Sequence, residues 1–286
     1  MGANSSADAA AGPSSVCGTQ TIQRAALLLR LLTNHNRTGL RLVDLAALSK
    51  IERPTAHRML HGLIAEGFVV QDQATKRYYL GPALYEMGLA ASPKNHLRDI
   101  CQPYLQWITA KTGATVFLTV RSGFDGVCLD RKNGVTPMQI QDPGLDFDVG
   151  QHRPLGIGTG CLALLSALPD HMVDRIISVN EQRRAFARES ITLRQLRQQI
   201  AQTRETGYAT RTLPTAPSVS AVGLIIPVAS GGSIGAVSIR ELSRRLQGRW
   251  KDQLVCILRR AASDIGYIVQ KNLHGRDMDS TLPVAQ

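Results

Sequence analysis

The chain has 286 residues, enough for two domains of the usual size of about 100–200 residues each. Its 33 Lys and Arg residues, mostly Arg, outnumber its 22 Asp and Glu, and the net charge of +11 indicates an anionic partner, nucleic acid or a membrane surface. No apolar run is long enough to cross a bilayer and no signal-peptide pattern opens the chain, so we expect a soluble cytoplasmic protein without a membrane partner. Five scattered Cys residues without a CxxC motif indicate reduced, buried thiols and exclude a disulfide framework.

The first helical patterns follow an N-terminal stretch that is rich in Ala, Ser and Gly. We expect that stretch, residues 1–18, to be a disordered tail. From residue 19 onward, apolar side chains recur at helical spacing, which predicts a first helix with a stripe formed by Ile22, Ala25, Leu29 and Leu32. A second, shorter apolar helix is expected over Val43–Leu48, carrying Leu45 and Leu48.

A third helix begins near Pro54, which suits the first position because its missing N–H costs no hydrogen bond there. The expected buried face carries Ala56, Met59, Leu60 and Leu63. The opposite face carries Thr55, Arg58 and Gly62. Gly67 ends the helix, and residues 68–71 and 77–80 are expected to pair as two strands around a basic loop. Residues 19–82 therefore have the pattern of a winged helix-turn-helix domain.

The front of the third helix has the chemistry of a DNA-reading surface. Arg can bind guanine with two hydrogen bonds, and Thr and the helix N-terminus can hold phosphate. The candidate DNA-binding residues on the helix are Arg53, Thr55, His57 and Arg58. Those of the two-stranded wing, which would contact phosphate, are Lys76 and Arg77. A winged helix that binds protein is the alternative, and the sequence leaves it open.

A linker helix is expected within residues 83–95, with Leu84, Met87 and Gly88 on a face suited to a partner subunit. The second domain, residues 96–271, alternates helices with strands that read as hairpins, and a polar, loose tail is expected over 272–286. Its expected helices are 96–111, one that follows the Gly-rich turn within 153–169, one within 183–207, and 254–269. Its expected strands are 114–120, 127–131, 136–141, 208–212, 221–228 and 234–240. Helices beside a mostly antiparallel sheet define an α+β sensor-like domain.

Blocks of sequence spread over about residues 19–270 resemble the IclR family of bacterial transcriptional regulators. The first domain contributes QRAALLLRLL, LRLVDLAAL, RPTAHRMLHGLIAEGFV and RYYLGPALYEMG, and the second contributes CLDR, RPLGIGTGCLALLSALP, RETGYA, VSAVGLIIPV and GAVSI. The resemblance implies a winged helix-turn-helix domain, a linker helix and a C-terminal GAF-like effector-binding domain. It further implies a homodimer or homotetramer that binds a roughly palindromic double-stranded DNA operator and responds to a small organic acid, as in the control of a catabolic operon.

The same resemblance locates an effector site. In the family, the Gly-rich turn holds the carboxylate of the ligand, and here that turn is formed by Gly158, Thr159 and Gly160. Free N–H groups that open a helix also favour an anion on physical grounds, although a tight turn that needs Gly for its dihedral angles is an equally good interpretation. Ser238 occupies the position of a ligand-facing hydroxyl.

Two positions depart from the pattern of family members that bind very small acids. Arg211 stands where those members have Asp, and Ser220 with Ala221 stands where they have Cys. The turn at Gly158 is also one residue shorter. Arg in place of Asp predicts a more anionic or larger effector, such as an aromatic or dicarboxylic acid.

The sequence contains no motif that predicts catalysis or metal binding, and we expect neither an enzyme nor a bound metal or cofactor. His57 and His61 are four residues apart, but the Glu of a metalloprotease HExxH motif is replaced by Arg58. The GIGTG turn lacks the Lys and Ser/Thr of a phosphate-binding P-loop. No GxSxG motif occurs, and no Cys lies near a His that would activate it. The loop and strand-end carboxylates are interpreted as solvated; they are Asp125, Asp130, Asp142, Asp146 and Asp148.

Overall fold

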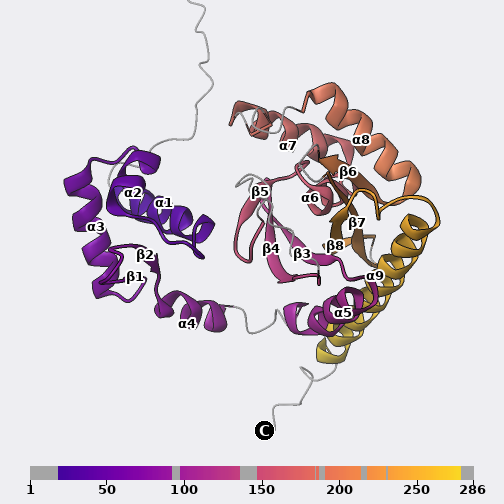
Figure 1. Cartoon of the computed structure of the whole chain (residues 1–286), viewed down its shortest axis with the longest axis horizontal. Coiled ribbons are helices and arrows are strands. Elements are labelled where there is room, and N and C mark those ends of the chain that lie inside the picture. Colours follow the sequence, from indigo (N-terminus) through magenta and orange to yellow (C-terminus); the bar gives the residue numbers. More distant parts are fainter. Residues whose placement is uncertain are drawn as a thin grey trace, which may run out of the picture. The chain divides into compact units, whose positions relative to one another are not determined.

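The computed structural model describes residues 19–91, 97–135, 147–183, 185–186, 191–213, 218–229 and 231–277. Its chain divides into two compact units, Met1–Ser92 and Pro93–Gln286 (Figure 1). The tail expected over 1–18, the strand expected over 136–141, and the candidate carboxylates Asp142 and Asp146 lie outside the described residues. Within them, no helix is long and apolar enough to cross a membrane.

The first unit is the expected winged helix-turn-helix. Its elements are α1 (Gln20–Asn34), α2 (Leu42–Ser49), α3 (Arg53–Ala65), β1 (Val69–Gln71), β2 (Tyr78–Leu80) and α4 (Pro82–Ala91). β1 and β2 pair antiparallel, with Val69 opposite Leu80. The turn between α2 and α3 passes through Lys50, which has a left-handed φ of 55°, and the Ser49 hydroxyl accepts a hydrogen bond from the Ile51 N–H at 3.3 Å.

The core of this unit gathers one apolar face from each helix and strand. Its buried members are Leu28, Leu32, Leu40, Leu45, Ile51, Ala56, Leu60, Val69 and Tyr78. Two residues of the predicted apolar patterns are not buried, since Ile22 is 70% exposed and Leu48 is 52% exposed. The buried residues of α1 lie in its second half, so the first turn of α1, with Ile22, extends beyond the core. Pro54 is the second residue of α3, where the N–H groups still have no partner within the helix.

The second unit is built on a six-stranded antiparallel sheet in the order β5-β4-β3-β8-β7-β6. Its strands are β3 (Thr115–Ser122), β4 (Asp125–Lys132), β5 (His152–Pro154), β6 (Ala209–Leu213), β7 (Val219–Val228) and β8 (Gly232–Leu242). Its helices are α5 (Leu97–Thr112), α6 (Thr159–Ser166), α7 (Asp170–Gln182), α8 (Leu193–Thr206) and α9 (Gly248–Asp277). β5 and α7 were not expected. α9 continues to Asp277, so helix occupies residues 272–277, where we expected a loose tail.

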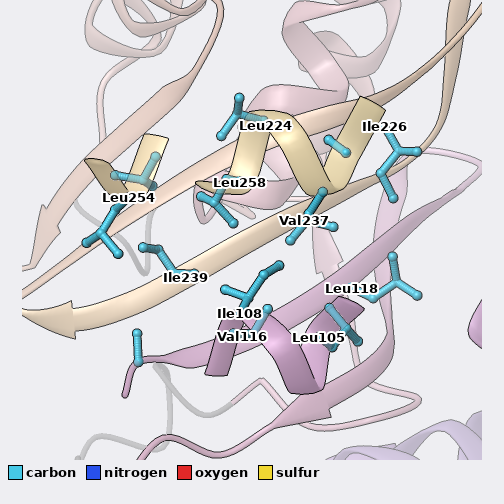
Figure 2. Packing of buried hydrophobic residues seen from close by; sticks show 14 of the residues in the cluster. Leu105, Ile108, Val116, Leu118, Leu224, Ile226, Val237, Ile239, Leu254 and Leu258 are labelled. Carbon is cyan, nitrogen blue, oxygen red and sulfur yellow. The ribbon is translucent and has the colours of Figure 1, made fainter. Parts of the chain in front are cut away.

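The two faces of this sheet are covered by different helices (Figure 1). α5 and α9 cover one face and bury Leu105, Ile108, Leu254 and Leu258 against the strands (Figure 2). α6 and α8 lie on the other face, and α7 adds Val173, Ile176 and Ile177 to the same core. Because side chains alternate along a strand, β3 sends Val116 and Leu118 to the α5–α9 core and leaves its intervening residues for the face that carries the candidate site.

Candidate DNA interface and effector cavity

The front of α3 presents basic side chains to solvent. Arg53, His57 and Arg58 are exposed, and Thr55 is half-buried at the edge of the same surface. Ala56 and Leu60 are fully buried on the opposite side and fix the orientation of the helix. Four of the predicted DNA-binding residues therefore lie along the N-terminal half of the helix that corresponds to a recognition helix.

Three further exposed polar residues on α3 and beside α2 were not singled out from the sequence as DNA-binding candidates. His61 is exposed, and its ring packs edge-on against the ring of His57 with centroids 4.5 Å apart. Arg41, just before α2, and Lys50, in the turn before α3, are also exposed. The sequence signal for Arg41 and Lys50 was their position at the ends of the first helix of the helix-turn-helix, the element that crosses the DNA backbone in this motif.

The loop between β1 and β2 is held in shape by Asp72, whose carboxylate accepts hydrogen bonds from the N–H groups of Ala74 and Thr75 at 2.9 and 2.8 Å. The hydrogen bonds from Thr75 lower the pKa of Asp72. Lys76 is exposed in this loop, and its Nζ donates to the Gln73 side chain at 3.1 Å. It is therefore placed at the loop surface, as a phosphate contact requires.

Arg77 forms hydrogen bonds within the first unit, a role that the sequence did not predict. Its guanidinium donates hydrogen bonds to the carbonyl oxygens of Thr38 and Gly39, at 3.2 and 2.9 Å. These bonds tie the loop after α1 to the hairpin. The structure thus gives Arg77 an intramolecular role, and its contact with phosphate stays a prediction.

The second unit contains a cavity between the N-terminus of α6 and strands β3, β6, β7 and β8. Its described lining residues are Phe117, Thr119, Phe147, Arg153, Ile157, Gly158, Thr159, Gly160, Cys161, Arg211, Leu213, Ala221, Ser238, Ile239 and Arg240. It encloses about 40 Å³, room for a few water molecules. A ligand that needs more space than this must therefore move side chains of the lining.

The structure brings most of the predicted effector residues to this cavity. Those that line it are Gly158, Thr159, Gly160, Arg211, Ala221 and Ser238. Ser220 is absent from the lining. Its hydroxyl lies 2.9 Å from that of Thr212 and 2.8 Å from that of Ser243, on the face opposite Ala221. Alternation along β7 sends these two neighbours to opposite faces, so only Ala221 can contact a ligand in the cavity.

Gly residues let the start of α6 lie directly on the sheet. Gly158, which precedes the helix, has a φ of 77°, a conformation that favours Gly. A Cβ on Gly160 would lie 2.8 Å from the Thr119 hydroxyl and 3.4 Å from the Ser238 hydroxyl. The turn therefore needs Gly both for its dihedral angle and for its close approach. The same geometry brings the N-terminus of α6 to two hydroxyl groups of the sheet.

Three guanidinium groups line the cavity, and sequence reasoning found only Arg211. Arg153 stacks on the Phe147 ring, 4.7 Å from its centroid, and Arg240 stacks on the Phe117 ring at 4.8 Å. No Asp or Glu occurs among the described lining residues. Guanidinium groups gathered around one cavity favour an anionic ligand.

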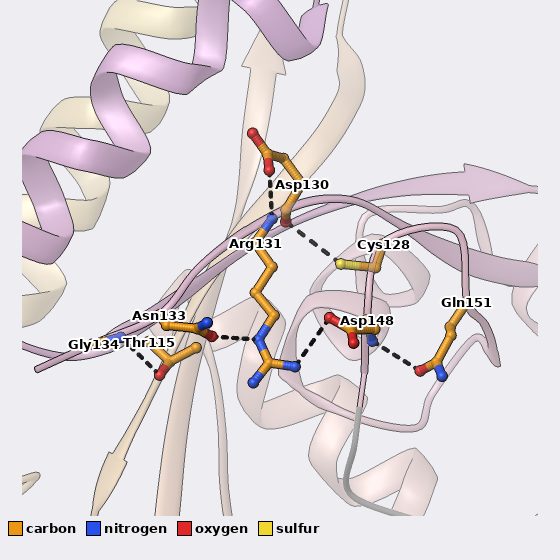
Figure 3. Close-up of polar contacts among 8 residues, drawn as sticks. All are labelled: Thr115, Cys128, Asp130, Arg131, Asn133, Gly134, Asp148 and Gln151. Carbon is orange, nitrogen blue, oxygen red and sulfur yellow. Dashed lines mark hydrogen bonds and ion pairs between the residues drawn. The ribbon is translucent and has the colours of Figure 1, made fainter. Parts of the chain in front are cut away.

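The aromatic wall of the cavity is fastened by a polar cluster (Figure 3). The Arg131 guanidinium pairs with Asp148 at 3.2 Å and donates to Asn133 at 2.9 Å. Asp148 follows Phe147, whose ring lies 6.3 Å from that of Phe117. We interpreted Asp130 and Asp148 as solvated carboxylates, and the structure contradicts this. Asp130 is 2% exposed and accepts a hydrogen bond from the Arg131 N–H. Asp148 is half-buried and pairs with the Arg131 guanidinium.

Cys161 is the one thiol among the described lining residues, and it is buried. Burial raises its pKa to about 12, so it is a neutral thiol at pH 7 and not an activated nucleophile. Cys101 and Cys128 are also buried, as expected, whereas Cys256 is exposed on α9, contrary to expectation.

Replacing Gly223 by Ala is expected to destabilise the second unit. A Cβ at this position would lie 2.8 Å from the backbone carbonyl of Thr159, so the start of α6 would have to move off β7. Overpacking of this kind costs about 1–3 kcal/mol. Gly232→Ala is the matched control, because its Cβ would meet only the Val228 side chain at 4.0 Å. Urea denaturation monitored by Trp fluorescence tests the difference, and equal midpoints for the two variants would contradict it.

The fold and the two surfaces together define a class of protein, the two-domain transcriptional regulator with a winged helix-turn-helix unit and a ligand-binding unit. Residues 21–73 match the family model described as "IclR helix-turn-helix domain", and residues 90–267 match "Bacterial transcriptional regulator IclR C-terminal". The chain therefore belongs to the IclR family, whose members matched here are DNA-binding transcriptional regulators and not enzymes.

Similar proteins extend over nearly the whole chain. The DNA-binding transcriptional repressor YiaJ of Escherichia coli K12 is 25% identical over 262 residues, which cover 90% of this chain and 91% of YiaJ. The glycerol operon regulatory protein of Streptomyces coelicolor is 28% identical over 246 residues, 85% and 93% of the two chains. The crystal structure of an IclR regulator from Alicyclobacillus acidocaldarius shares the fold, with a TM-score of 0.68, 21% identity and coverage of 87% and 98%.

Proposed function

We propose that the protein binds its operator through α3 and the β1–β2 loop, and that a small organic acid in the cavity of the second unit changes this binding. The proposed DNA contacts are Arg53, Thr55, His57, Arg58, Lys76 and Arg77. The proposed ligand contacts are Gly158, Thr159, Gly160, Arg211, Ala221 and Ser238. The observation that carries the proposal is the cavity, which is lined by the N-terminus of α6 and by three Arg side chains. The same chain contains a winged helix-turn-helix unit.

Relatives support the effector class. An IclR homologue from Microbacterium hydrocarbonoxydans, 20% identical with a TM-score of 0.66, over 88% of this chain and 100% of that one, was solved with 4-hydroxybenzoate. The name of the Streptomyces relative refers to a glycerol operon. By analogy, we propose that this protein controls a catabolic operon.

We further propose a homodimer or homotetramer. Tyr85 and Met87 on α4 are 68% and 56% exposed, and Ile22 on α1 is 70% exposed. Apolar patches that are exposed on a single chain mark subunit contacts, and we propose that these residues belong to such a contact. A dimer would place two recognition helices on a roughly palindromic operator with half-sites about one helical turn, or a multiple of it, apart. The effector would shift the equilibrium between subunit arrangements.

Fluorescence anisotropy tests the function directly. The purified protein is titrated onto its own upstream intergenic DNA and onto a scrambled duplex of equal length, at two salt concentrations. We expect a preference of about a thousandfold or more for the upstream DNA. A panel of organic acids should include one that changes operator affinity by about 5–150-fold, the usual range of allosteric coupling. Equal binding to both duplexes together with no response to any acid would contradict the proposal, and no DNA binding at all would favour a winged helix that binds protein.

A further inference from the structure

Arg211 and Arg240 belong to one row across three neighbouring strands. Arg211 on β6 pairs with Ala221 on β7, and Ala221 pairs with Arg240 on β8. Directly paired residues of antiparallel strands project from the same face of the sheet. Both Arg side chains therefore project into the cavity, one on each side of the small Ala221 side chain, and all three residues line the cavity. This row is the arginine end of the cavity.

The other end of the cavity is the start of α6. Ser238 lies two residues from Arg240 on β8, so the two side chains leave the same face about 6.6 Å apart. Gly160 packs against the hydroxyls of Ser238 and Thr119, and the guanidinium of Arg153 lies beside Gly158, where a Cβ would meet its Nη1 at 3.3 Å. This helix end of the cavity thus has its own hydroxyls, its own guanidinium and the N-terminus of α6.

Thr119 provides an independent sign that a ligand belongs at the helix end. It is 1% exposed and lines the cavity, yet its hydroxyl has no hydrogen-bond partner among the described residues. A buried hydroxyl without a partner is costly, and native proteins rarely leave one unsatisfied. A carboxylate oxygen at the helix end would accept the missing hydrogen bond.

We propose that the cavity binds a dicarboxylate, with one carboxylate at the helix end and the second at the arginine end. This inference rests on the proposed effector function. Each carboxylate would form charge-assisted hydrogen bonds with a different set of groups. The rings of Phe117 and Phe147 supply an apolar wall for the spacer between the two carboxylates. Because the space is small, binding would move side chains of the lining, such as the half-buried Arg153.

Isothermal titration of the full-length protein with matched acids tests the proposal. Terephthalate is compared with benzoate, and adipate with hexanoate, so that each pair differs by one carboxylate. In at least one pair we expect the diacid to bind about tenfold tighter or more. Arg211→Gln should weaken that diacid by about tenfold and leave the monoacid within about twofold, so that the preference disappears. Thr119→Val, which keeps the side-chain shape, should weaken both acids of the pair by similar factors.

Arg194→Gln is the control, because Arg194 is exposed on α8, outside the cavity, and its loss removes the same charge. Circular dichroism confirms that each variant is folded. The proposal is overturned if neither diacid is preferred, if no acid of the two pairs binds, or if Arg211→Gln affects the two acids of a pair equally. If a monoacid still alters operator binding in such a case, the proposed regulator function stands and only the two-ended site fails. Loss of every acid effect on operator binding would instead remove the effector function itself.

Discussion

Arg58→Ala is expected to abolish most of the preference of the protein for its operator. Arg58 is exposed on the front of α3, on the side of the helix opposite the buried Ala56 and Leu60. Loss of one Arg that contacts guanine costs about 1–3 kcal/mol and relaxes specificity at that base pair. If a dimer uses the residue in both half-sites, the loss doubles to about 2–6 kcal/mol, which is a large part of the usual specificity range. Anisotropy on operator and scrambled DNA measures the change.

Lys76→Ala separates base reading from phosphate binding. Lys76 lies at the exposed loop of the hairpin, so its loss should weaken binding to both duplexes alike and reduce the salt slope by about one. Arg194→Ala again removes a positive charge from the second unit and should change neither quantity.

Retention of the operator preference by Arg58→Ala within about twofold would show that α3 does not read bases through this residue.

The first unit was predictable because its signals are local. Each signal lies within a few residues of the element that it predicts; the signals are helical periodicity, the position of Pro54 and a Gly before the hairpin. The structure places the elements within one or two residues of the expected bounds. The error at Ile22 has a tertiary cause. The apolar stripe continues along α1, but only the half that packs against the other helices is buried, and a stripe alone does not reveal where the core ends.

The cavity was only partly predictable, because it is assembled by strand register. Arg211 and Arg240 are far apart in sequence and meet through their common partner Ala221, and no local pattern of residues encodes that register. The choice between Ser220 and Ala221 likewise depends on which face of β7 is turned to the cavity. Thr119 has the sequence pattern of an ordinary strand residue. That its hydroxyl has no hydrogen-bond partner among the described residues can be recognised only from the folded structure.

Two missed elements differ in what the sequence offered. β5 has three residues, too few for an alternating pattern, and it forms only because it pairs with β4 at the edge of the sheet. α7 carried a usable signal. Val173, Ile176 and Ile177 follow helical spacing and are all buried, so attention to periodicity after Pro169 would have found it.

Leu60→Ala is expected to unfold the DNA-binding unit while the second unit stays folded. Leu60 is fully buried on the back of α3, in the core that α1, α2 and the hairpin share. Removing a buried Leu side chain costs about 2–5 kcal/mol, and a unit of this size has little stability to spare. Operator binding should therefore fall with the folded fraction of the first unit. The acid should still bind, because its proposed site lies wholly in the second unit.

The two Trp residues make this separation measurable. Trp107 on α5 and Trp250 on α9 both pack on the core of the second unit, so Trp fluorescence reports on that unit alone, whereas far-UV circular dichroism reports on both. In Leu60→Ala, the dichroism should gain an early transition in urea while the fluorescence midpoint stays that of the wild type. Leu48→Ala, the same change at a 52% exposed site, should shift neither probe appreciably. A single shifted transition seen by both probes would mean that the units unfold together, and a ligand in one unit could then act on the other through shared stability.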